Sequence, residues 1–155
     1  MTSRSERDRK RWQMLAEFRC SLRSFLQFSE RRAEQAGLHP QQHQLLLQIA
    51  GVPDGTDTTV SYAADRMGLR HNSVVELSIR CEEAGLLMRM HDPADRRRVK
   101  LKVTPEGERV LRVLSADHER ELKELLPRLV ESLSLIEQAR KNAAEDATAK
   151  IGEHN

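Results

Sequence analysis

Residues 69–104 read LRHNSVVELSIRCEEAGLLMRMHDPADRRRVKLKVT. The stretch predicts a helix, a short strand, a polar tip with three consecutive arginines, and a second strand. In that second strand Val99, Leu101 and Val103 alternate with basic residues, which is the period-two pattern of a strand with one buried face. Because a helix followed by a basic-tipped hairpin can grip two grooves of DNA, both fold and function depend on this stretch.

A second short helix is predicted just before this one. Thr59 or Ser61 can cap it, since either hydroxyl can accept from the free N–H groups of the first turn. A glycine ends it, and the next helix covers about residues 71–84, with Asn72 or Ser73 near its cap. Two short helices joined by a tight glycine-containing turn form a helix-turn-helix.

The helix at residues 71–84 has two distinct faces. Val74, Leu77, Ser78 and Cys81 lie at i, i+3, i+4 and i+7, so we expect them to face inward. The other side is short, polar and rich in hydrogen-bond donors, which suits phosphates and base edges; the alternative is an ordinary solvated face. The helical residues predicted to contact DNA are Ser61, Arg70, His71, Asn72, Ser73, Glu76 and Arg80.

The hairpin at residues 86–103 has a polar tip, HDPADRR, followed by a third arginine. Arg96, Arg97 and Arg98 are placed where a wing would reach a minor groove, whose negative potential attracts guanidinium groups. Asp95 precedes Arg97 by two residues, close enough to hold its side chain in a carboxylate–guanidinium pair. A solvated charge run is the alternative, but the preceding helix-turn-helix favours a DNA-binding wing.

Long helices are predicted on either side of this region. Residues 8–36 repeat apolar side chains at three- and four-residue spacing, and Thr104-Pro105-Glu106 is a strong helix start. The second apolar stripe continues to Pro127, which predicts a kink or a new helix. From Lys141 onward we expect a fraying helix and a loose tail. Helices at 8–36 and 105–145 are therefore predicted to dimerise, on either side of a DNA-binding region at 40–104.

Composition agrees with a mainly helical protein. The chain has 155 residues, of which 32% are charged and only 3% aromatic, so we expect one domain over residues 1–155 rather than a β-sandwich. It has no apolar run near the roughly 20 residues of a membrane span, and its start, MTSRSERDRKRWQ, lacks a signal-peptide core. The chain has only two cysteines, Cys20 and Cys81, which agrees with a reducing compartment. We therefore predict a cytoplasmic protein without a membrane partner.

The net charge of +2 is unevenly distributed. Residues 61–103 carry nine Lys/Arg against six Asp/Glu, whereas residues 104–155 carry eight against eleven. The basic excess is modest, but it is concentrated at the hairpin tip, which favours DNA binding there.

The order of elements and the local residues resemble the MarR family of bacterial transcriptional regulators. The resemblance covers roughly residues 10–140. It is most specific in SYAADRMGLRHNSVVEL, EEAGLLMR and DPADRRRVKLKVTPEG. It implies a winged helix-turn-helix homodimer whose first and last helices intertwine, with helix 71–84 in the major groove and Arg97, fixed by Asp95, in the minor groove.

The resemblance further implies a repressor that binds double-stranded DNA at a pseudo-palindromic operator. In many members a small, often aromatic or phenolic, effector releases the DNA. Two positions depart from the family pattern: Glu76 stands where a donor is frequent, and Ile79 where an aspartate commonly precedes the arginine matching Arg80. A carboxylate at 76 repels phosphate but could accept from a cytosine amine.

Other functions find less support in the sequence. No nucleophile–base, P-loop or dinucleotide motif occurs, so neither an enzyme nor a cofactor is predicted. Cys20 could sense oxidants and Cys81 is expected in the core. His39 and His43, joined by His118, could bind a metal, but an exposed histidine pair at a helix start is the simpler interpretation. A winged-helix module that binds an acidic protein remains the alternative outside DNA binding.

Overall fold

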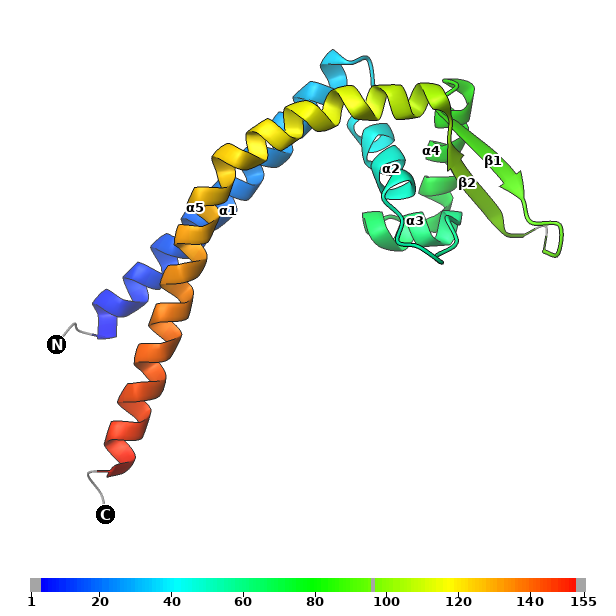
Figure 1. Ribbon diagram of the computed structural model, residues 1–155. Helices are drawn as coiled ribbons and strands as arrows, with labels where there is room; N and C mark the ends of the chain where they lie inside the picture. The colour runs from blue at the N-terminus through cyan, green and yellow to red at the C-terminus, as the bar shows by residue number, and fades with distance from the viewer. Residues whose placement is uncertain (1–3, 96, 153–155) are drawn as a thin grey trace. The chain divides into compact units, whose positions relative to one another are not determined.

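The computed structural model describes residues 4–95 and 97–152. Within these residues the fold is mainly helical with one two-stranded antiparallel sheet, which confirms the predicted winged helix-turn-helix with long terminal helices (Figure 1). In chain order the elements are α1 Arg4–Gln35, α2 Pro40–Ala50, α3 Val60–Met67, α4 His71–Glu83, β1 Leu87–His91, β2 Val99–Val103 and α5 Pro105–Gly152.

The chain divides into two compact units. The winged-helix unit comprises Ser29–His118, and the helical unit combines α1 up to Phe28 with α5 from Glu119 onward. Both long helices therefore contribute to both units.

The helix-turn-helix consists of α3 and α4. Thr59 caps α3, because its Oγ1 accepts a hydrogen bond from the Tyr62 N–H at 3.1 Å. Gly68 ends α3 with φ of 64°, a left-handed conformation that glycine adopts without a steric cost. Helix α4 begins at His71, where the sequence predicts it. Arg70 is the N-cap residue and makes no side-chain capping bond, and Asn72 and Ser73 lie near it in the first turn. Their hydroxyl and amide groups are consequently not used as the helix cap.

The core of the winged-helix unit forms where α2, α3, α4 and the sheet meet. All four residues predicted to face inward from α4 are buried, and Leu77 is only 1% exposed. From α2, Leu45, Leu46 and Ile49 join them. The core is therefore closed within this unit of a single chain.

The hairpin pairs β1 with β2 in antiparallel register, from Leu87 opposite Val103 to His91 opposite Val99. Leu101 and Val103 point into the core, as the alternation predicts. A short piece of the loop before α3 adds to the other edge of β2, through an isolated bridge between Thr59 and Lys100. The hairpin is thus attached to the helices on its β2 side.

The start of α5 is fastened to the end of α4. The Thr104 hydroxyl donates to the Gly85 carbonyl at 2.7 Å and accepts from the Gly107 N–H at 3.1 Å, as expected of a capping threonine. A Cβ atom on Gly107 would lie 2.2 Å from the Leu86 carbonyl oxygen. Any larger residue at 107 would force this junction apart.

Helix α5 excludes one of the two alternatives predicted at Pro127, a new helix. It runs without interruption through Pro127 to Gly152, so no new helix begins at the proline and the backbone from Lys141 to Gly152 is helical. Pro127 removes one backbone donor and still leaves the flanking turns bonded. A polar, alanine-rich sequence also has a high helix propensity, which explains why the helix continues.

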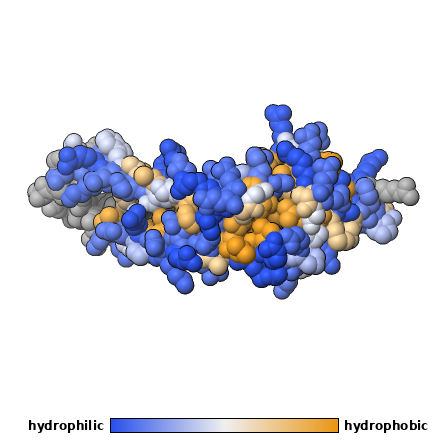
Figure 2. All heavy atoms as spheres, turned by 90° about the horizontal axis from the view of Figure 1, so that it is seen from above, coloured by the Kyte–Doolittle hydropathy of each residue, from blue (hydrophilic) through white to orange (hydrophobic). Residues whose placement is uncertain are grey.

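The helical unit leaves many apolar side chains uncovered. Trp12 is 68% exposed, and Leu126 and Leu133 are each just over half exposed. Figure 2 draws one face of the whole chain, on which apolar residues gather in a patch among hydrophilic ones without being confined to this unit. Among the described residues, no helix is both long and apolar enough to cross a membrane.

Candidate nucleic-acid interface

The outward face of α4 is polar and open to solvent. Its inward residues are buried, whereas the residues predicted to read DNA are exposed throughout. Because buried leucine and valine side chains hold the helix from behind, the polar groups are presented on a rigid support. The exposed set is Arg70, His71, Asn72, Ser73, Glu76 and Arg80, with Ser61 exposed at the start of α3.

The wing tip is organised by two aspartates acting on the backbone. The Asp92 carboxylate accepts from the Ala94 N–H at 2.9 Å, and the Asp95 carboxylate accepts from the Arg97 N–H at 3.0 Å. The expected pair between Asp95 and the Arg97 guanidinium is therefore replaced by a bond to the main chain. A short aspartate side chain readily reaches the N–H two residues later, which makes it a turn-former.

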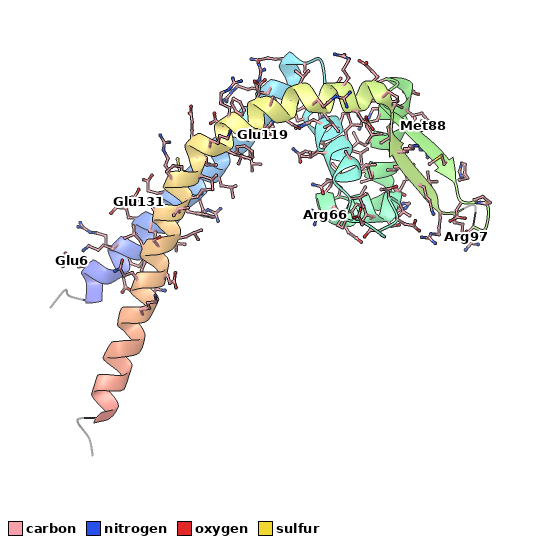
Figure 3. The ribbon with its side chains drawn as sticks, in the orientation of Figure 1. Glu6, Arg66, Met88, Arg97, Glu119 and Glu131 are labelled. Atoms are coloured by element: carbon pink, nitrogen blue, oxygen red, sulfur yellow. The ribbon has the colours of Figure 1, made fainter. Side chains whose placement is uncertain are left out.

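The arginines of the tip have different environments. Arg97 is exposed at the far end of the hairpin, well away from Met88 at its base (Figure 3). Arg98 instead forms an ion pair with Asp57, with 2.9 Å between Nη2 and Oδ2. Arg96 lies outside the described residues.

Asp57 is the residue of this surface that the sequence did not reveal. It lies in the loop before α3 and also pairs with Lys100 of β2, whose Nζ is 2.9 Å from Oδ1. The hydrogen bond from Lys100, its charge and the charge of Arg98 hold the pKa of the Asp57 carboxyl below its usual value. No local motif marks this aspartate, because its partners are about 40 residues further along the chain.

The structure brings the two predicted DNA-contacting groups together. A shallow hollow in the surface is lined by Ser61 of α3, His71 of α4, and Arg97 and Arg98 of the wing, with Thr59 and Val99 beside them. The first turn of α4 and the wing thus form one continuous polar surface. Glu76 and Arg80 are exposed further along α4 and do not line the hollow.

Of the two histidines predicted to be exposed at a helix start, His39 is placed as predicted and His43 is not. His39 caps α2, where its Nδ1 accepts from the Gln41 N–H at 3.3 Å. His43 is buried rather than exposed, and its ring stacks on His118 with centroids 5.0 Å apart. Burial, reinforced by His118, lowers the pKa of His43 from 6.5 to about 4. Among the described residues, no group of three or more side chains is arranged to hold a metal ion.

The two cysteines also have distinct environments. Cys81 is buried in the core, as predicted, and burial raises the pKa of its thiol to about 11. A thiol in this state is a poor nucleophile. Cys20 is exposed on α1.

Comparisons with known proteins agree with this fold. A MarR family model matches residues 36–98, which contain α2, α3, α4, β1 and the wing tip. A crystal structure of MarR is 26% identical, covers 86% of this chain and 90% of its own, and has a TM-score of 0.60. AbsC, a MarR family transcriptional regulator from Streptomyces coelicolor, is 20% identical, covers 96% and 98%, and has a TM-score of 0.66.

A third similar structure is a complex of MepR from S. aureus with DNA, which is 22% identical, covers 85% of this chain and 94% of its own, and has a TM-score of 0.63. No curated protein matches the sequence. The fold defines the class as a winged helix-turn-helix protein. Over residues 36–98 the chain matches the MarR family, and solved structures of MarR family transcription regulators share its fold.

Proposed function

We propose that the chain acts as a homodimer that represses transcription by binding a pseudo-palindromic operator. In each half-site, α4 lies in the major groove and the wing reaches the adjacent minor groove. The observation that carries the proposal is the shared hollow, in which Ser61 and His71 meet Arg97 and Arg98. Donors from two elements on one surface suit a duplex, because the major groove and the flanking minor groove are contacted together.

The proposed base-reading groups are the exposed residues of α4. Asn72 and Ser73 in its first turn can bond base edges, and Arg70 and Arg80 can bond phosphates or guanine. Glu76 is exposed in the same row and suits only a donor such as the cytosine amine. The proposed wing contacts are Asp95 as a support and the three arginines 96–98.

The dimer proposal rests on the uncovered apolar side chains of the helical unit. Exposed leucines on both α1 and α5 would lose contact with water if a second copy packed there. We assign dimerisation to residues 8–36 and 105–145, and DNA binding to residues 40–104. The MepR complex with DNA supports the DNA part of the proposal, since it has the same fold.

The proposed control is release of the operator by a small, aromatic effector. It rests on the match of residues 36–98 to the MarR family, and the effector's identity would come from a ligand screen against the bound complex.

The binding proposal is tested by titrating the protein against a fluorescent, random-sequence duplex of about 30 base pairs. We expect the logarithm of the binding constant to fall linearly with the logarithm of the salt concentration, because lysine and arginine displace counterions from phosphates. Binding that is undetectable at about 50 mM salt, or independent of salt, would contradict a DNA-binding surface. Either result would favour the protein-interaction alternative.

A further inference from the structure

The starting observation is that one carboxylate engages two cations of the wing. Asp57 Oδ2 lies 2.9 Å from Arg98 Nη2, and Asp57 Oδ1 lies 2.9 Å from Lys100 Nζ. Asp92, at the start of the tip, is a more distant partner of Lys100 at 3.9 Å. Two of the basic side chains of the wing are thus balanced by acidic groups of the chain itself.

The position of Asp57 is set by the backbone beside it. The neighbouring Thr58 accepts from the Leu101 N–H at 2.7 Å through its carbonyl, and its hydroxyl donates to the Leu101 carbonyl at 2.7 Å. Thr59 bridges to Lys100 and also caps α3. The segment 57–59 is therefore held beside β2, and it places the Asp57 carboxylate next to the wing.

These ion pairs contribute little to folding. Asp57 and Arg98 each keep about half of their side-chain surface exposed, at 49% and 50%. Water and salt screen pairs of this kind, so their removal leaves the fold intact. Their effect is on charge: the Asp57 carboxylate neutralises Arg98 and Lys100, which would otherwise be available to a phosphate.

We propose that Asp57 is a specificity-determining residue that limits non-specific DNA binding by taking the place of a phosphate beside Arg98 and Lys100. The inference rests on the DNA-binding function proposed above. With Asp57 in place, those two side chains neutralise a carboxylate, while Arg97, which has no ion pair among the described residues, remains available to a groove. Non-specific binding depends almost entirely on the number of phosphates neutralised, so restraining two cations weakens it more than operator binding, which also uses base contacts.

The test compares Asp57→Asn with the matched control Asp54→Asn. Both remove one negative charge from the same exposed loop, but only Asp57 contacts the wing cations. Binding to a random-sequence duplex is measured from about 50 to 300 mM salt. The salt slope is the slope of log affinity against log salt concentration. We expect it to steepen by about one to two units in Asp57→Asn, and we expect non-specific affinity to rise about tenfold. Asp54→Asn should change the slope by less than about half a unit.

Two further measurements make the result specific. Asp57→Glu keeps the charge and should restore most of the wild-type slope. The ratio of operator to random-sequence affinity should fall in Asp57→Asn.

An Asp57→Asn slope equal to that of Asp54→Asn, or weaker binding to random DNA, would overturn the inference while leaving the proposed function standing. A wild-type protein that binds no duplex would instead overturn the proposed function and this inference with it.

Discussion

The winged-helix unit and the helical unit use apolar residues in opposite ways. In the winged-helix unit, core leucines such as Leu45, Leu77 and Leu101 are at most 1% exposed. In the helical unit, Trp12 and Leu126 remain more than half exposed, although both helices are long and regular. The winged-helix part therefore has a closed core within one chain, whereas the helical part keeps an exposed apolar surface, which is the surface assigned to the second copy in the proposed dimer.

The largest expected effect is on the closed core. Leu77→Ala should lower the free energy of unfolding by about 2–5 kcal/mol, because it leaves a cavity behind α4. Urea denaturation measures this loss, and Met88→Ala, at a residue 46% exposed on β1, is the control that should change little. A loss below about 1 kcal/mol would show that the core is not packed as described.

A charge placed on the exposed apolar surface of the helical unit should weaken the proposed dimer. Leu126→Lys places an ammonium on the surface assigned to dimerisation, so the dimer dissociation constant should rise at least about a hundredfold, or about 2.7 kcal/mol. Analytical ultracentrifugation measures it. Met88→Lys makes the same change on the wing and should leave the dimer intact. An unchanged dimer in Leu126→Lys would break the comparison between the two units.

A buried histidine makes the winged-helix unit sensitive to acid. The pKa of His43 is about 4 in the folded state against 6.5 ordinarily, so the unfolded chain binds more protons between these values. Its contribution is present above pH 6.5 and is lost as pH falls toward 4, with about 2 kcal/mol lost between pH 7 and pH 5. Urea unfolding at both pH values should show that His43→Gln removes this loss, while exposed His71→Gln retains it.

The smallest predicted effect separates the wing tip from the core of the same unit. Arg97→Ala should weaken operator binding at least tenfold, about 1.4 kcal/mol, without changing the free energy of unfolding. Fluorescence anisotropy measures the affinity. Arg109→Ala, on the exposed side of α5, removes an equal charge away from the hollow and should bind nearly as well as the wild type. Equal loss in the two variants would point to overall charge rather than to the wing.

The sequence predicted those parts of the fold that depend on local periodicity. The inward face of α4 and the alternation of β2 both follow from spacing, and the buried residues are the expected ones. The start of α4 lies at residue 71, as predicted, although its N-cap residue, Arg70, makes no side-chain capping bond. Pro127 looked like a boundary, yet the bonds of the turns around it carry the helix through.

Contacts between distant segments could not be predicted in this way. The stacking of His43 on His118 joins α2 to α5, and the pairing of Asp57 with Arg98 joins a loop to the wing. Neither has a characteristic spacing, since both depend on how the elements pack. For the candidate site, residue types and exposed faces were accessible from sequence, whereas the partners that restrain the cations were not.

The central claim is that two copies of one α4-and-wing surface read a symmetric DNA site. The most direct measurement is selection of bound sequences from a random duplex pool at moderate salt, followed by sequencing. If two copies read the site, we expect an enriched inverted repeat whose half-sites are centred about one helical turn apart, roughly 10 base pairs. Recovery of sequences with no shared motif, or of a single motif without its inverted copy, would contradict it.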